Sequence, residues 1–363
     1  LISQLSRLRW LFVIARGSSF RFRGAAAEPA KVRAALNVRY VLSGTAELAG
    51  GRIALTVELV DARDGGIVWS DRFSDRIEAV HEIREQIAQA VIAALELQIP
   101  LHEARLARIS APENLDAWQA YHLGLSHLYR FNREDNARAA GLFRKAIARQ
   151  PDFARAYAGL SFASFEDAFL NLTPDAEAAA HQARTFAEHS LDLDGLDPFC
   201  NLVMGRAFWL TGDLEAMVPW LERAIALHPN YAQAKYARAF ALTMMGDAPN
   251  GQAGADSALA LSPLDPLAYA MRSVRTFSHI VFDERESAAQ WGERAARSPG
   301  AHALIDLIAA VGHSLNGDDD RASFWAASAR RRDPDISADH FFYAFPMRQP
   351  DARQRIAGAL ARL

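Results

Sequence analysis

Two segments of the chain contain residue types that could bind a metal ion. His81 and Glu82 begin like the zinc motif H-E-x-x-H, but the position of the second histidine holds Glu85, so that ligand is absent. Residues 190–195 partly resemble a calcium loop, yet its first ligand would be Ser190 and its closing acid would be Asn201. We therefore interpret the first segment as an exposed helix face and the second as a helix end with its turn.

Other residues with possible chemistry also have structural interpretations. Residues 316–320 concentrate carboxylates, but Asp favours helix N-termini, where it caps the backbone and interacts with the helix dipole. His181 and His189 lie about two helical turns apart, which argues against a shared metal ion. The glycine pairs at 50–51 and 65–66 lack the spacing of phosphate-binding loops and instead predict hairpin turns.

We expect no enzyme activity, no cofactor and no metal site in this chain. An enzyme would require titratable groups with perturbed pKa values that converge in a pocket, and no set of residues in the sequence predicts one. The elements that the sequence does predict are typical of a protein that binds a partner.

The composition fits a globular domain followed by a helical array. The chain has 363 residues, 50% of them hydrophobic and 23% charged, with a formal net charge of -3. Residues 1–40 carry +7 and the rest -10, which can mark a nucleic-acid surface, although an Arg-rich bacterial composition explains it more simply. Cys200 is the only cysteine, and no apolar run approaches the roughly 20 residues that span a bilayer. We expect a cytoplasmic protein that contacts neither a membrane nor nucleic acid directly.

A proline recurs every 34 to 36 residues in the C-terminal two-thirds, at Pro229, Pro263, Pro299 and Pro334. Periods of this length indicate stacked pairs of short amphipathic helices. Repeated Gly-Asp pairs are expected to end one helix and begin the next. Gly and Ala at fixed positions would let the two helices of a pair approach closely, while a larger apolar side chain fills the gap.

The first hundred residues predict a small α+β domain with helices on one face of a mixed sheet. Alternation at residues 19–23 predicts a half-buried strand, and later strands are expected at 40–48, 53–60 and 68–73. Helices are expected at 27–37 and 77–97, the first of them ending at Asn37 in a left-handed cap.

The predicted fold class is therefore an α+β N-terminal domain followed by an all-α helical solenoid. We expect three regions: an N-terminal domain, about six repeats and a C-terminal helical cap, at residues 1–105, 113–334 and 335–363. The chain begins with Leu1 directly inside an apparent helix, and we expect it to be a fragment of a longer protein.

Residues 117–334 resemble the tetratricopeptide family, through Leu123-Gly124, Ala139, Phe143 and the recurring prolines. The runs "LSRLRWLFVIARGSSFRFRG", "VRYVLSGTAEL" and "VELVDARDGGIVWSDRF", within residues 1–75, resemble the TolB amino-terminal-like domain, whose first strand is missing here. That resemblance implies a domain placed between an N-terminal output module and the repeats. The output module of that family is a class III adenylate cyclase or a winged-helix DNA-binding domain.

The function expected from these patterns is a non-catalytic regulatory and protein-interaction region of a bacterial signalling protein. The first helices of successive repeats line a concave face that can hold a protein or peptide partner, and self-association is also possible. We lean towards a transcriptional regulator as the parent protein; a class III adenylate cyclase and a stand-alone repeat adaptor are the alternatives. The residues expected to line the groove are Tyr121, His122, His127, Asn201, Arg206, Trp209, Lys235, Arg238, Tyr269 and Arg272.

Overall fold

The computed structural model describes residues 2–5, 8–22, 24 and 28–363, and the side chains of these residues except 3, 4, 79–83, 85 and 112. The chain forms two compact units, the N-terminal unit Leu1–Glu103 and the repeat unit Ala104–Leu363. The side chains of the His81, Glu82 and Glu85 motif lie outside the described residues.

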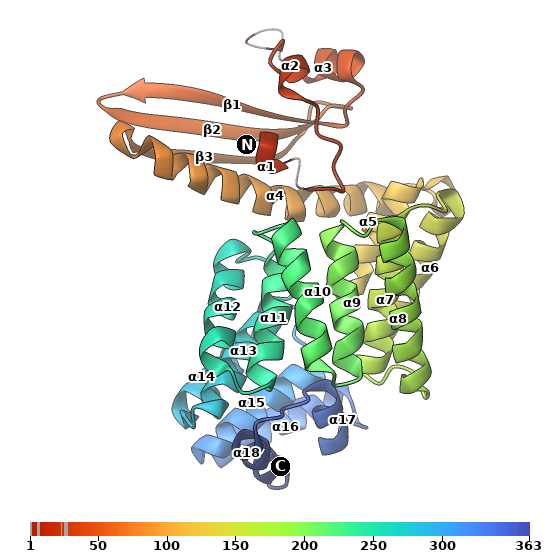
Figure 1. The fold of residues 1–363 in the computed structure, drawn as a ribbon, viewed down its shortest axis with the longest axis vertical. Helices are drawn as coiled ribbons and strands as arrows, with labels where there is room; N and C mark the ends of the chain where they lie inside the picture. The colour runs from red at the N-terminus through yellow and green to blue at the C-terminus, as the bar shows by residue number, and fades with distance from the viewer. Residues whose placement is uncertain (1, 6–7, 23, 25–27) are drawn as a thin grey trace. The chain divides into compact units, whose positions relative to one another are not determined.

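Among the described residues of the N-terminal unit, three strands form an antiparallel sheet in the order β1-β2-β3 (Figure 1). They are β1 (Tyr40–Ala49), β2 (Arg52–Asp61) and β3 (Ile67–Arg76). Tyr40 pairs with Asp61 at one end of the sheet. Gly50 and Gly51, both at positive φ, form the two-residue turn between β1 and β2, the geometry in which glycine is preferred. The expected hairpins are confirmed, but the sheet is antiparallel rather than mixed.

The helices of this unit are α1 (Ile2–Leu5), α2 (Arg16–Ser19), α3 (Pro29–Leu36) and α4 (Val80–Ile109), which extends past the end of the unit. Asn37 follows α3 with φ 50° and ψ 45°, so the predicted left-handed cap is confirmed. Ile87, Val91 and Leu95 of α4 are buried at helical spacing.

A buried polar cluster joins α4 to the ends of β1 and β2. The hydroxyl of Tyr40 donates to the Glu103 carboxylate, and His102 Nε2 lies 2.9 Å from Asp61 Oδ2. Arg63 pairs with both carboxylates. Glu103 and Asp61 are 0% and 1% exposed, so these partners are what makes their burial tolerable.

The strand predicted at residues 19–23 is wrong over the residues that the structure describes. Arg16–Ser19 is the short helix α2, and Phe20–Phe22 continue it as a turn through local backbone hydrogen bonds. Arg23 lies outside the described residues. Alternation of Phe and Arg satisfies the period of a strand, but a strand also needs a partner edge, and the sheet order includes no strand from this segment.

The repeat unit contains six helix pairs between Ala117 and Arg332, a stretch whose backbone is described throughout (Figure 1). The helices on the inner side are α5 (Ala117–Leu128), α7 (Ala154–Phe169), α9 (Pro198–Leu210), α11 (Ala232–Met244), α13 (Ala268–Val281) and α15 (Ala303–Asn316). Their partners are α6 (Arg133–Arg149), α8 (Ala176–Leu193), α10 (Leu214–Leu227), α12 (Ala248–Leu261), α14 (Arg285–Ala296) and α16 (Asp319–Arg332). Two further helices follow, α17 (Ala338–Ala344) and α18 (Pro350–Leu360).

The Gly-Asp pairs act as predicted, because each glycine adopts a positive φ and the following aspartate caps the next helix. Gly212, for example, has φ 68°, and Asp213 accepts a hydrogen bond from the backbone of Ala216. The same arrangement occurs at Gly246-Asp247 and at Gly317-Asp318. The carboxylates at 316–320 thus include a helix cap, and residues 190–195 are the end of α8 and its turn.

Small residues allow the close helix packing that the sequence predicts. A Cβ atom added to Gly124 of α5 would lie 2.6 Å from the ring of Phe143 of α6, and one added to Gly159 of α7 would lie 2.7 Å from the same ring. Gly205 has the same relation to Leu221, at 2.8 Å. Each large side chain therefore occupies space that only glycine leaves open.

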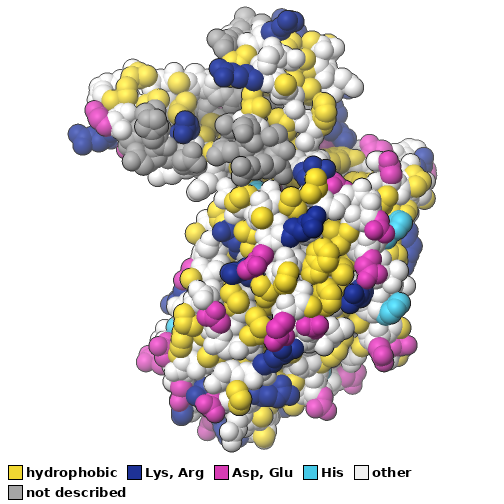
Figure 2. All heavy atoms as spheres, in the orientation of Figure 1, with side chains coloured by type: hydrophobic (Ala, Val, Ile, Leu, Met, Phe, Trp, Pro, Cys, Tyr) yellow, Lys and Arg dark blue, Asp and Glu magenta, His cyan; other side chains and the backbone are white. Residues whose placement is uncertain are grey.

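Among the described residues, no helix is long and apolar enough to cross a membrane. Figure 2 shows basic and acidic side chains interspersed over the visible face of the repeat unit.

Candidate functional site

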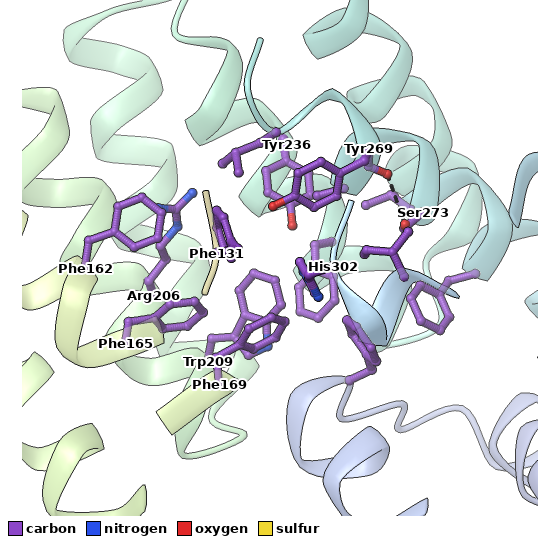
Figure 3. Close-up of a pocket in the computed structure, with 17 residues that line it drawn as sticks. Phe131, Phe162, Phe165, Phe169, Arg206, Trp209, Tyr236, Tyr269, Ser273 and His302 are labelled. Carbon is purple, nitrogen blue, oxygen red and sulfur yellow. Dashed lines mark hydrogen bonds between the residues drawn. The ribbon is translucent and has the colours of Figure 1, made fainter. Parts of the chain in front are cut away.

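The inner helices of the repeat unit enclose a pocket lined mainly by aromatic rings (Figure 3). Helix α7 contributes three phenylalanines at positions i, i+3 and i+7, which share one helix face. Further rings come from α9, α11, α13 and the segments that precede α6, α15 and α18. We call this site the aromatic pocket; its defining residues are Phe131, Phe162, Phe165, Phe169, Arg206, Trp209, Tyr236, Phe240, Tyr269, His302 and Phe345.

The rings pack directly on one another, so the cavity between them is small. Trp209 and Phe240 stack with ring centroids 3.6 Å apart, and Phe165 and Phe169 stack at 5.3 Å. The remaining cavity is about 30 Å³, which is room for about two water molecules. A larger ligand would fit only if a lining side chain moved.

Phe131 closes one part of the pocket in a strained backbone conformation. Its φ is 50°, a left-handed value that bulky side chains rarely adopt. It stands in the turn between α5 and α6, where three later repeats use the glycine of a Gly-Asp pair. Its ring stacks on His302 at 5.4 Å and meets Tyr269 edge-on at 5.9 Å. The contacts of this ring across the inner face compensate for the strain in the turn.

Arg206 places a positive charge inside the pocket. It is 2% exposed, and its guanidinium lies 3.9 Å from the ring centroid of Phe162, a cation-π arrangement that Figure 3 shows. Its Nη1 atom has no hydrogen-bond partner among the described residues, and neither does the hydroxyl of Tyr269. A buried guanidinium with spare donors is suited to recognising a carbonyl or carboxylate group.

Glu166 of α7 is a second buried charged side chain near the pocket. It is 0% exposed, and neither carboxylate oxygen has a hydrogen-bond partner among the described residues. Burial raises the pKa of Glu166 well above its usual value, although the charge of Arg206 partly opposes this. Burial also lowers the pKa of His302 to about 3, so this imidazole is neutral at physiological pH.

A hydrogen-bonded polar group joins distant parts of the inner face. The hydroxyl of Tyr129 donates to Gln233 Oε1 at 3.2 Å, and Gln233 Nε2 lies 3.4 Å from Asp265 Oδ1. Burial raises the pKa of Tyr129 to about 12, so it remains a neutral donor. The first repeat is thus tied to α11, which is the fourth inner helix when α5 is counted as the first.

Three of the ten residues predicted to line the groove come together in the aromatic pocket: Arg206, Trp209 and Tyr269. Tyr121 and His122 are each 1% exposed within α5, and Asn201 donates to the backbone carbonyl of Asp197.

The other predicted groove residues lie elsewhere on the repeat unit. His127 Nδ1 lies 2.6 Å from Asp135 at the start of α6, and Lys235 of α11 is half-buried. Arg238 pairs with Glu222 of the outer helix α10, and Arg272 donates a hydrogen bond to Ser298 in the turn after α14. The involvement of all ten in partner binding stays a prediction, and the buried members could reach a partner only after a rearrangement.

Sequence reasoning did not select the phenylalanines of the pocket. The spacing of Phe162, Phe165 and Phe169 could have identified them, because it places three large rings on one face of an inner helix. Phe131 stands where other repeats have a glycine, and this departure was also visible. Nothing in the local pattern indicated Phe345, whose position depends on how residues after α16 fold.

The lining is suited to binding a ligand. Its polar groups are a guanidinium, an indole N–H, two phenols, one serine hydroxyl and a neutral imidazole. Among the residues that the structure describes, no group of three or more His, Cys, Asp or Glu side chains is placed to hold a metal ion. The aromatic surface would contribute affinity, and Arg206 would orient a polar group.

Comparison with known proteins shows a similarity to a curated protein. The chain is 28% identical over 202 residues to the "Putative adenylate cyclase 3" of Rhizobium meliloti (strain 1021). The matched residues make up 54% of this chain and 34% of that protein. The chain thus spans about a third of that relative's length. No family model matches the chain.

Solved structures with similar folds include several repeat proteins. The pilF protein of Pseudomonas aeruginosa is 17% identical, with a TM-score of 0.41 over 62% of this chain and 94% of that one. A tetratricopeptide repeat protein from Parabacteroides merdae ATCC 43184 is 12% identical, with a TM-score of 0.39 over 66% and 91%. The Cut9-Hcn1 hetero-tetramer of APC/C gives 14% identity and a TM-score of 0.49 over 77% and 48%.

These scores are too low to support an argument by themselves. The repeat architecture is instead established by the helix pairs, the left-handed turn residues and the glycines that face large side chains. The repeat unit is a tetratricopeptide-like helical solenoid, and a small antiparallel sheet precedes it in the chain.

Proposed function

We propose that this chain is a non-catalytic regulatory region whose repeat unit binds a protein or peptide segment on its inner face. The observation that carries this proposal is the aromatic pocket, where Arg206 is buried against Phe162 and its Nη1 atom has no hydrogen-bond partner among the residues that the structure describes. Aromatic and arginine side chains dominate the affinity of protein interfaces. A solenoid also presents its inner helices as one continuous surface.

We further propose that the region controls a nucleotide cyclase. The similarity to a protein named as an adenylate cyclase supports this, because it extends over 202 residues while leaving two-thirds of that protein outside the match. A cyclase domain in the unmatched part is consistent with a regulatory role for the matched part. The TolB amino-terminal-like assignment of residues 1–105 remains part of this proposal.

A winged-helix transcriptional regulator was the parent favoured from sequence, and it remains the alternative. The relative described above is named as an adenylate cyclase, so the cyclase takes precedence. A stand-alone adaptor that binds its partner or a second copy of itself is the remaining possibility.

A chimera of the Rhizobium meliloti relative tests the proposal. Three purified proteins are compared for the rate of cyclic AMP formation: the relative, a version lacking the matched region, and a version carrying this chain in its place. We expect removal to change the rate and replacement to restore it towards the original. Equal rates for all three would contradict the cyclase proposal and favour the alternatives. The isolated chain serves as the control and should form no cyclic AMP.

A further inference from the structure

The segment between α16 and α18 crosses the ends of several inner helices. We call residues 338–349 the strap; it comprises α17 and the five residues after it. His340 Nε2 lies 2.9 Å from the backbone carbonyl of Phe169, the last residue of α7. The indole of Trp209, near the end of α9, donates to the backbone carbonyl of Ala344 at 2.8 Å. His340 lies 171 residues after Phe169 in the sequence, and Ala344 lies 135 residues after Trp209.

Arg348 continues this path along the helix ends. Its backbone N–H donates to the carbonyl of Met244, the last residue of α11, at 2.8 Å. Its guanidinium donates to the carbonyl of Gly212 and pairs with the Glu215 carboxylate. The carbonyl groups at helix ends lack partners within their own helix and are therefore general acceptors. The strap satisfies such groups in three successive repeats, as a bound peptide would.

Two phenylalanines anchor the strap between the inner helices. Phe341 and Phe345, four residues apart, are 0% and 4% exposed. The ring of Phe345 lies 5.2 Å from Phe277 and 5.8 Å from Phe169, and it forms part of the wall of the aromatic pocket. Phe341 packs at 6.2 Å from Phe277. Apolar anchors at i and i+4 are the pattern by which a short amphipathic helix enters a groove.

Helix α18 makes its own contacts with the last inner helices, separate from those of the strap. Ala352, Ile356 and Ala359 of α18 are each 0% exposed, and this helix contacts α13 and α15. Arg355 donates to the carbonyl of Ile280 at the end of α13. Because helix α17 has seven residues, it is too short to be stable alone in water. Its conformation therefore depends on the groove that holds it.

We propose that the residues of the aromatic pocket other than Phe345, together with the adjoining helix ends, form a receptor for a short aromatic segment of a partner protein, which the strap occupies in cis. The partner segment would carry two aromatic side chains four residues apart on a helical turn and an arginine three residues later, as Phe341, Phe345 and Arg348 do. Binding of that segment displaces the strap, while α18 stays docked. This inference deepens the proposed function, because it specifies what the inner face binds and how access is regulated.

A labelled peptide with the sequence of residues 337–349 tests the receptor on the full chain. Fluorescence anisotropy compares the wild type with a Phe341→Ala, Phe345→Ala variant whose own strap is weakened. In the wild type the covalently attached strap competes with the labelled peptide at an effective concentration near about the millimolar range. Because the strap of the variant is weakened, we expect the variant to bind the peptide at least about tenfold more tightly than the wild type does. A control peptide with alanine at both anchor positions should bind neither protein.

Three results would overturn the proposal: equal binding to both proteins, equal binding of both peptides, or no binding to a variant whose circular dichroism shows it is folded. A wild-type dimer that the double substitution abolishes would also overturn it, since the occupant would then be the strap of a second copy. Should the variant fail to fold, Arg348→Ala replaces it, with the same expected order of affinities.

Hydrogen exchange of the wild type provides an independent measurement. We expect the backbone amides of residues 341–345, 347 and 348 to exchange at least about tenfold faster than those of α11, because the strap opens without unfolding the repeats. Equal protection would overturn the proposal. The cyclase chimera does not depend on the strap, so a null result there with positive peptide binding would reject the proposed parent and retain the receptor.

Discussion

The ring of Phe143 offers a sharp test of how the repeats pack. It is 0% exposed and lies between Gly124 of α5 and Gly159 of α7. In an exposed helix, Gly→Ala is stabilising by about 1 kcal/mol, because alanine loses less backbone entropy. At Gly124 the added Cβ would lie 2.6 Å from the ring, whereas ordinary contacts are 3.4–4 Å. The ring would have to move towards Gly159, where there is no spare space.

We therefore expect Gly124→Ala to destabilise the repeat unit. Overpacking of a filled core costs about 1–3 kcal/mol. The ring is confined on both sides, so we take the upper end, about 3 kcal/mol, and subtract the propensity gain of about 1 kcal/mol. The net loss is about 2 kcal/mol, which lowers Tm by about 4–8 °C in a domain of this size. Thermal unfolding followed by circular dichroism at 222 nm measures it.

Gly141 supplies the matched control. It lies in α6, is exposed, and has nothing within 4 Å of the position of a new Cβ. Gly141→Ala should raise stability by about 1 kcal/mol. Phe143→Leu should cost less stability in the Gly124→Ala background than in the wild type, because the smaller side chain relieves the contact. If Gly124→Ala stabilises the protein as much as Gly141→Ala does, the packing argument is refuted.

Three further predictions concern buried ionisable groups. Glu166→Met should stabilise the protein at pH 7 by about 1–3 kcal/mol, measured by urea unfolding, because it removes a carboxyl with no hydrogen-bond partner among the described residues. Burial lowers the pKa of His302 to about 3, whereas an unfolded histidine titrates near about 6.5. The free energy of unfolding of the wild type should therefore fall by about 1.4 kcal/mol per pH unit as pH falls below about 6.5. The substitution His302→Phe should reduce this slope, which urea unfolding between about pH 7.5 and 5 measures. Burial opposes the ionisation of Asp61, but the hydrogen bonds of Arg63 and His102 outweigh it and hold the pKa of Asp61 below its usual value. The N-terminal unit should therefore lose stability as pH falls below about 4. The Asp61→Asn variant should lose less stability over the same pH range.

Each of these has an outcome that contradicts it. Glu188 forms an exposed ion pair with Arg184, so Glu188→Met should change the stability by less than about 1 kcal/mol. If Glu166→Met changes the stability by the same amount as Glu188→Met, burial of the Glu166 carboxyl is not the cause of the effect. An unchanged slope in His302→Phe would mean that the imidazole is accessible to protons in the folded protein. For Asp61, parallel pH profiles of wild type and variant would remove this carboxylate from the acid response.

The repeat architecture could be predicted because it depends on local rules that recur. A Gly-Asp pair requires only that glycine adopts a positive φ and that aspartate caps the next helix, as Gly212 and Asp213 do. Helix pairs of similar length then stack in the order of the chain. The strand predicted at residues 19–23 failed because a strand depends on a partner edge, which is not a local property.

The candidate site was only partly predictable. Arg206, Trp209 and Tyr269 were selected because they are polar or aromatic on inner helices, and they do converge. Arg238 has the same sequence character, yet it pairs with Glu222 of α10. The residue type at a helix position does not specify which neighbour its side chain reaches, since this depends on helix rotation within the stack.

The helix pairs, their turns and the hairpins can be derived from the amino-acid sequence, because they follow from periodicity, capping and residue identity within short windows. Three features required the folded chain: the contact of Phe131 with His302 across the inner face, the burial of Glu166 without a partner among the described residues, and the return of the strap to the ends of α7, α9 and α11. Those contacts join residues up to 171 positions apart, and they depend on how each repeat is rotated against the next, a quantity that no local pattern encodes.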